Sequence, residues 1–88
     1  MNAVLPATPV SLRLSDLAPG QRGIVERVDA SCPIGRRLLD LGFRPGTALR
    51  VIRRAPLGDP TSYELRGSRF CLRRSEADRV DVTLLPGG

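Results

Sequence analysis

The chain has 88 residues, of which 41% are hydrophobic and 26% are charged, and its formal net charge is +5. This length allows one small domain, and the composition excludes an intrinsically disordered chain. No apolar run is long enough to span a bilayer, and Pro6 and Pro9 interrupt the apolar residues near the start. The sequence therefore predicts neither a secretory signal nor direct membrane insertion, and we expect a cytoplasmic protein.

The chain divides into three segments by composition. Residues 1–10 are expected to form a flexible tail, residues 11–84 one domain, and residues 85–88 a second tail. At the start of the domain, Ser15 is placed to cap a single helical turn among several leucines, before a turn at Pro19-Gly20. Residues 23–28 are rich in β-branched side chains whose apolar positions do not alternate strictly. This pattern predicts a strand that carries a bulge or a strong bend.

A short helix is predicted at about residues 33–41, with Ser31 or Cys32 as its N-terminal cap. The spacing of Ile34, Leu38 and Leu41 places these side chains on one face, which we expect to pack on the core. Gly42 stands where a left-handed C-terminal cap is favoured.

The second half of the chain reads as strands separated by tight turns. Strands are predicted at about residues 49–54, 63–66, 70–73 and 80–84, and the loop 55–60 contains two prolines. Gly67-Ser68 is predicted as a two-residue type II′ hairpin loop, and Ser75 as the cap of a one-turn helix at about 75–79. The order of elements predicts a mainly β fold, a small closed SH3-like barrel of about five strands with a short inserted helix.

The sequence lacks the usual groups of enzyme active sites. It contains no histidine, so a Ser or Cys triad is excluded, and its acidic residues are scattered without a close pair. No phosphate-binding loop pattern is present. We expect a protein that is not an enzyme and needs no cofactor. Cys32 and Asp29 are weak candidates for divalent-metal binding, although packing of a small side chain is the favoured interpretation of Cys32.

All fourteen basic residues are arginines, which suggests an acidic partner or reflects genome composition. Residues 19–25 resemble the first strand of KOW-type nucleic-acid-binding barrels. Nucleic-acid barrels usually present stacking aromatics, and here Tyr63 and Phe70 are expected in the core. Nucleic-acid binding is therefore kept as an alternative function and not as the favoured one. Direct sensing of a divalent metal is a second alternative.

An ordered series of short motifs runs through residues 11–84. It comprises Gly20, Gly23 and Val25, Arg37-Leu38, Leu41-Gly42-Phe43, Pro45-Gly46, Val51, Pro56-Leu57-Gly58-Asp59-Pro60, Gly67, Leu72-Arg73, Glu76-Ala77 and Val82. In this combination the chain resembles the FeoA family. The same module resembles the C-terminal SH3-like domain of iron- and manganese-dependent repressors, but too few residues precede it here for their DNA-binding domain, so a standalone module is expected.

The resemblance implies a non-enzymatic accessory role in ferrous-iron uptake and iron homeostasis. The implied partner is FeoB, a membrane transporter with a cytosolic GTPase domain. Weak transition-metal binding and self-association are both compatible with this role. Without catalytic groups, such a protein acts by binding one state of its partner more tightly than another. The helix end and the rigid loops are the candidate partner-binding surface, with Leu39, Phe43, Arg44, Arg53, Pro56, Leu57 and Asp59 as its residues. The alternative for Leu39 and Phe43 is that they close the end of the barrel.

Overall fold

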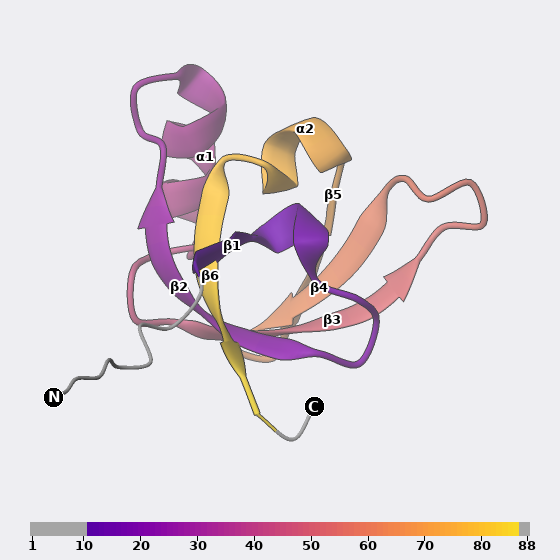
Figure 1. Ribbon diagram of the computed structural model, residues 1–88. Coiled ribbons are helices and arrows are strands. Elements are labelled where there is room, and N and C mark those ends of the chain that lie inside the picture. Colours follow the sequence, from indigo (N-terminus) through magenta and orange to yellow (C-terminus); the bar gives the residue numbers. More distant parts are fainter. Residues whose placement is uncertain (1–10, 87–88) are drawn as a thin grey trace, which may run out of the picture.

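A computed structural model describes residues 11–86 of the chain, so the two predicted tails lie almost wholly outside the described part. The described part of the chain consists of short strands, short helices and turns (Figure 1). They are β1 (Ser11–Arg13), the 3-10 turn η1 (Leu14–Asp16), β2 (Arg22–Val28), α1 (Pro33–Leu41), β3 (Ala48–Arg54), β4 (Thr61–Leu65), β5 (Ser68–Leu72), α2 (Arg74–Ala77) and β6 (Val80–Leu85).

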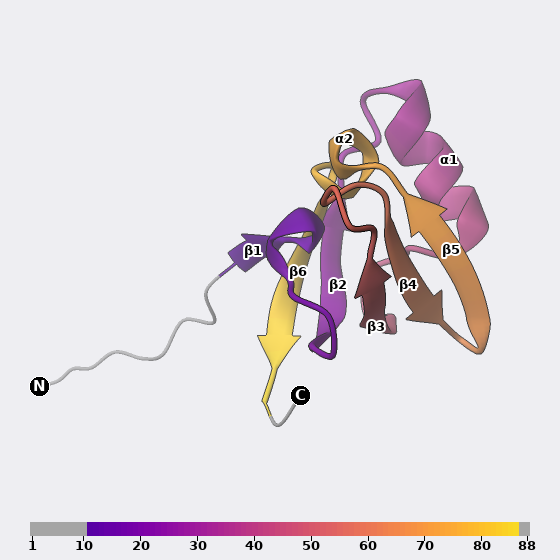
Figure 2. The same cartoon turned by 90° about the vertical axis from the view of Figure 1, so that its right-hand side faces the viewer.

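The strands form a single antiparallel sheet in the order β1-β6-β2-β3-β4-β5, which can be followed from one edge to the other in Figure 2. The mainly β prediction is confirmed, with six strands instead of about five. The additional strand, β1, is three residues long and pairs with β6 through Leu12 opposite Val82. The predicted closure of the barrel is wrong, because the edge strands β1 and β5 do not pair with each other.

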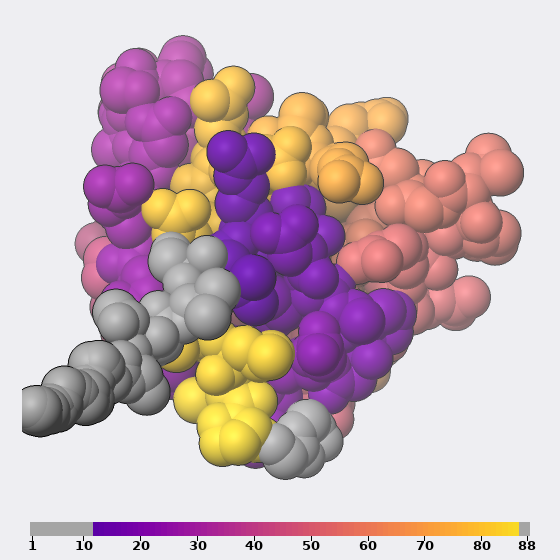
Figure 3. Space-filling view, viewed as in Figure 1, coloured from indigo at the N-terminus to yellow at the C-terminus, as the bar shows by residue number. Residues whose placement is uncertain are grey.

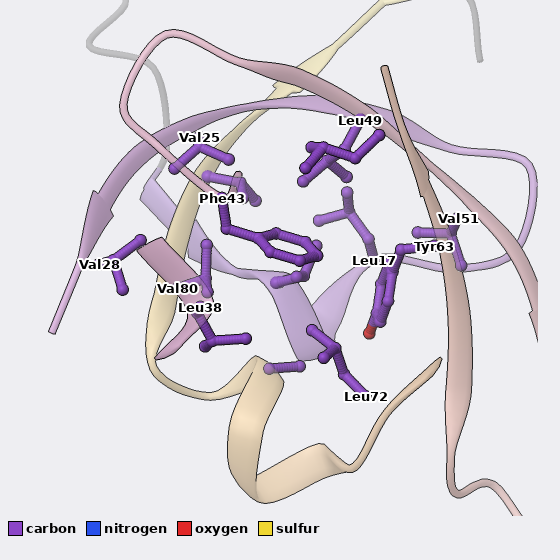
Figure 4. Close-up of a cluster of buried hydrophobic side chains, with 14 residues drawn as sticks. Leu17, Val25, Val28, Leu38, Phe43, Leu49, Val51, Tyr63, Leu72 and Val80 are labelled. Atoms are coloured by element: carbon purple, nitrogen blue, oxygen red, sulfur yellow. The ribbon is translucent and has the colours of Figure 1, made fainter. Parts of the chain in front are cut away.

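The sheet curves around a core of fourteen buried apolar side chains, ten of which are labelled in Figure 4. Tyr63 is almost completely buried, as the sequence predicts, and its ring lies among leucine and valine side chains. The turn η1 and helix α2 contact each other on the open side of the curved sheet. They close off the core where strand pairing stops.

Two bulges bend the sheet. The pairing of β2 with β6 shifts register between Val25 and Arg27, which confirms the irregularity predicted for this strand. The pairing of β3 with β4 shifts between Val51 and Arg53. Both shifts help the strands to curve while their apolar side chains continue to face the core.

Helix α1 packs through a face that differs from the predicted one. Leu38 is fully buried and Gly35 is buried beside it, whereas Leu41 is 38% exposed, so the prediction that Leu41 faces the core is wrong. The cause is the close approach of Gly35 to the preceding loop, where an added Cβ would lie 1.6 Å from the carbonyl oxygen of Asp29. Because α1 contacts the loop at Gly35, the face of the helix that packs on the core includes Leu38 and Leu39, and Leu41 lies outside that face.

The predicted ends of α1 are confirmed. Cys32 is the N-terminal cap residue and Pro33 occupies the first turn. Gly42 adopts the left-handed conformation, with φ of 115°, and its N–H donates to the carbonyl of Leu39 at 3.1 Å.

Two turns differ in detail from their predictions. The hairpin loop is Arg66-Gly67, because Leu65 pairs with Ser68. Both loop residues have positive φ (52° and 81°), as a type I′ turn requires, so the type II′ prediction is wrong. Helix α2 begins at Arg74, and the carboxylate of Glu76 accepts a hydrogen bond from the N–H of Arg73 at 2.8 Å, so Ser75 is not the cap.

Candidate partner-binding surface

The seven residues predicted to bind a partner lie in two separate places. Leu39, Phe43 and Arg44 belong to the end of α1 and the corner that follows it, and the other four belong to the end of β3 and the β3–β4 loop. Strand β3 runs between the two groups, and seven residues at about 3.3 Å each separate them by roughly 20 Å. The two groups lie on opposite sides of the molecule in Figure 1. The seven predicted residues therefore form two groups at opposite ends of β3.

Phe43 is a core residue. Its side chain is fully buried, and its ring meets the half-buried ring of Phe70 edge to face, with centroids 5.5 Å apart. The left-handed cap at Gly42 turns the chain back on the helix, and the N–H of Phe43 donates to the carbonyl of Leu38 at 3.0 Å. This geometry aims the aromatic side chain inward, so its assignment to a partner surface is wrong. Leu39 is partly buried and packs against the same core.

The β3–β4 loop holds one leucine in solvent. Leu57 is 97% exposed, far more than the other exposed large apolar side chains of the described residues, Leu41 (38%) and Leu84 (39%). The backbone around it is fixed by hydrogen bonds from the N–H of Gly58 to the carbonyl of Ala55 (2.7 Å) and from the N–H of Ala55 to the carbonyl of Pro60 (3.0 Å). The exposed position predicted for Leu57 is confirmed.

Asp59 ties the loop to the rest of the domain. Its carboxylate accepts a hydrogen bond from the N–H of Arg74, the first residue of α2, at 2.9 Å. The loop nevertheless stands out from the body of the molecule, as the space-filling view shows (Figure 3). Pro56, Leu57 and Asp59 thus form a small anchored protrusion with an apolar tip, and Arg53 is exposed on the strand that leads into it. We call residues 55–60 the Leu57 loop.

The candidate metal ligands do not face each other through their ligating atoms. The sulfur of Cys32 lies 3.7 Å from the main-chain carbonyl of Asp29, not from its carboxylate. That carboxylate accepts hydrogen bonds from the N–H (3.1 Å) and hydroxyl (2.5 Å) of Ser31 and forms an ion pair with Arg79 at 3.5 Å. The hydrogen bonds from Ser31, with a smaller contribution from Arg79, lower the pKa of Asp29. Within residues 11–86, no group of three or more His, Cys, Asp or Glu side chains converges on one point.

The described residues also lack a platform for stacking nucleic-acid bases. Phe43 and Tyr63 are buried and Phe70 is partly buried, so no aromatic ring of residues 11–86 stands free in solvent. Several arginines are instead engaged within the domain. Arg50 pairs with Glu64 at 2.9 Å, Arg27 pairs with Asp81 at 3.2 Å, and Arg37 pairs with Glu76.

The match to a known protein family covers nearly the whole described region. The family model described as the FeoA domain matches residues 12–84. The chain belongs to the FeoA family. Among curated proteins, it is 34% identical over 74 residues to a fusion of Fe(2+) transport protein A with the Fe(2+) transporter FeoB from Porphyromonas gingivalis. The match covers 84% of this chain but only 9% of the fusion protein.

Solved structures of FeoA proteins have the same fold. The FeoA protein of Stenotrophomonas maltophilia, an SH3-domain protein solved with zinc, is 39% identical, with a TM-score of 0.74 over 81% of this chain and 88% of that one. A manganese-dependent transcriptional repressor bound to manganese is 25% identical, with a TM-score of 0.78 over 89% of this chain and 38% of that one. The SH3-like fold and the resemblance to the repressor domain are both confirmed. Within the described residues of this FeoA-family chain, none of the helices has the length and apolar character needed to cross a membrane.

Proposed function

We propose that this FeoA-family chain is a cytoplasmic, non-enzymatic accessory protein of ferrous-iron transport that binds a FeoB-type transporter through the Leu57 loop. The relative from Porphyromonas gingivalis supports the choice of partner, because it joins a matching module to FeoB in one polypeptide. Fusion keeps two modules at a high effective concentration, which favours pairs that act together. A separate chain needs a binding surface to achieve the same association.

The exposure of Leu57 is the observation that supports this surface most strongly. A leucine that is 97% exposed gains about 1.5–3 kcal/mol when it is buried by a partner. The hydrogen bonds of the loop fix its backbone before any partner arrives, so little backbone entropy is lost on binding. Arg53 lies next to the loop and adds a guanidinium that suits an acidic rim on the partner.

The effect on the transporter follows from the lack of catalytic groups. A small domain without such groups changes its partner only by binding one conformation more tightly than another. A difference of about 1.4 kcal/mol between the two conformations shifts their ratio tenfold, which burial of one leucine side chain can supply.

The test is the affinity of the purified chain for detergent-solubilised FeoB of the same organism, compared between wild type and Leu57→Asp. Loss of one buried leucine weakens binding by about 10- to 100-fold. The variant retains its fold because substitutions at fully exposed positions change stability by only about 0.5 kcal/mol.

Leu84→Asp is the matched control, since it places the same charge at an exposed leucine on β6. We expect its affinity to stay within about twofold of wild type. Equal affinities of wild type and Leu57→Asp would refute the proposed surface. Leu39→Asp is not a suitable test of binding, because Leu39 packs against the core and the charge would destabilise the domain.

A further inference from the structure

A small polar pocket lies beside the Leu57 loop, on the open side of the sheet. Its volume is about 140 Å³, and it lies between η1, β3, β4 and α2. Its lining residues are Ser15, Arg54, Gly58, Thr61, Tyr63 and Arg74. At about 30 Å³ per water molecule the pocket holds four or five waters, which is room for one oxyanion but not for a nucleotide.

Arg54 is the central group of this pocket. Its side chain is partly buried and donates to the carbonyl of Leu17 at 2.6 Å and to the hydroxyl of Thr61 at 3.3 Å. These bonds use two of the five guanidinium N–H groups. Among residues 11–86 no carboxylate forms an ion pair with Arg54. A partly buried guanidinium without a counter-charge is costly, and a bound anion would remove that cost.

Further hydrogen-bond donors surround Arg54. Arg74 is one of the lining residues, and within the described residues its guanidinium forms no ion pair. Tyr63 reaches the pocket from the core, and Figure 4 shows its hydroxyl at the end of the ring near Leu72, away from Leu49. Burial raises the pKa of Tyr63, so its phenol stays protonated at neutral pH and retains its donor proton.

Two carboxylates lie near the pocket, and each accepts a hydrogen bond from an uncharged group. Asp59 accepts a hydrogen bond from the N–H of Arg74, and Asp78 accepts one from the hydroxyl of Ser15. Neither of them forms an ion pair with either pocket arginine. The guanidinium groups of Arg54 and Arg74 thus have no salt bridge among the described residues, and their N–H groups can donate to a bound oxyanion.

We propose that this pocket binds a single oxyanion, phosphate or carboxylate, through the guanidinium groups of Arg54 and Arg74. The oxyanion has two sources, free inorganic phosphate or an acidic side chain of the protein that docks on the Leu57 loop. Gly58 belongs to both the pocket and the loop, so an acidic side chain beside the leucine-binding site of the partner would reach the pocket.

The pocket itself is tested on the ¹⁵N-labelled full chain by titration with sodium phosphate, and separately with sodium acetate, against sodium chloride at equal ionic strength. The readouts are the Nε–H signal of Arg54 and the amide signals of Gly58, Thr61 and Arg74. We expect saturable shifts confined to these signals. Arg74→Gln weakens the binding about tenfold, because it removes one charge-assisted contact.

Arg66→Gln is the matched control, since it removes the same charge from the exposed hairpin loop and leaves the binding unchanged. Arg54→Lys, which keeps the positive charge and loses the planar fork, serves as a second variant and also weakens binding. Shifts that fail to saturate with both anions would overturn the pocket, as would equal titrations of wild type and Arg74→Gln.

The source of the oxyanion is decided by adding phosphate to the FeoB binding assay at constant ionic strength. If added phosphate weakens FeoB binding, the pocket is occupied by a carboxylate of the partner in the complex. If FeoB binding is unchanged, the ligand of the pocket is free phosphate. Only this second step rests on the proposed function. Saturable anion binding by a chain that does not bind FeoB would refute the proposed function alone. FeoB binding by a chain that shows no saturable anion binding would refute the pocket alone.

Discussion

Replacing Gly35 with alanine tests how closely α1 packs on the loop before it. The added Cβ would lie 1.6 Å from the carbonyl oxygen of Asp29 and 2.6 Å from its carbonyl carbon, whereas ordinary contact begins near 3.4 Å. The helix would have to move outward by about 2 Å, which disturbs the packing of the buried Leu38. Overpacking of this kind costs about 3 kcal/mol at the upper end of its usual range, and the higher helix propensity of alanine returns about 1 kcal/mol.

The net destabilisation expected for Gly35→Ala is about 2 kcal/mol, which for a domain of this size lowers the melting temperature by about 8–16 °C. Thermal and urea denaturation followed by circular dichroism measure both quantities. Asp40→Ala is the control, because it changes an exposed position of the same helix and shifts stability by only a few tenths of a kcal/mol. A Gly35→Ala variant as stable as wild type, or more stable, would refute the packing described for α1.

Two further predictions concern the acidic residues that fix loops. Because the pKa of Asp29 is lowered from its ordinary value of 3.8, its stabilising effect is present above that pH and is lost as the pH falls through the lower folded-state value. Asp29→Asn is therefore less stable than wild type at pH 7, and the difference in stability shrinks as the pH falls below 3.8, as measured by urea denaturation; a difference independent of pH would contradict this. Asp59→Ala removes the acceptor for the N–H of Arg74, so we expect a stability loss of about 1 kcal/mol and faster hydrogen exchange at the Arg74 amide. Unchanged hydrogen exchange at that amide would show that the hydrogen bond to Asp59 does not stabilise the domain.

The elements that could be predicted from the sequence are those with local causes. Gly42 ends α1 because the left-handed conformation is easily reached only by glycine, and this can be read from one residue. The bulge in β2 follows from the broken alternation of its apolar residues. Strand β1 has no such local signal, because three residues become a strand only by pairing with β6, about seventy positions later. The open edge of the sheet escaped prediction for the same reason.

The candidate surface was only partly predictable. Leu57 could be recognised because an apolar residue between Pro56 and Gly58 has no regular structure to bury it. Phe43 could not be placed correctly, since its inward direction depends on the chain reversal after Gly42. The separation of the two groups of residues depends on the direction of β3, which comes from the sheet and not from the loop sequences. Arg54 gave no signal either, because its significance lies in the absence of a nearby carboxylate among the described residues.

The most direct test of the proposed function is site-specific photo-crosslinking between this chain and FeoB in a membrane preparation. A photoreactive amino acid replaces Leu57 in one variant and Leu84 in the other, because both positions are exposed and lie on different elements. We predict a covalent adduct with FeoB from position 57 and none from position 84. Adducts of equal yield from both positions, or an adduct from position 84 alone, would contradict the claim that the Leu57 loop is the surface that binds the transporter.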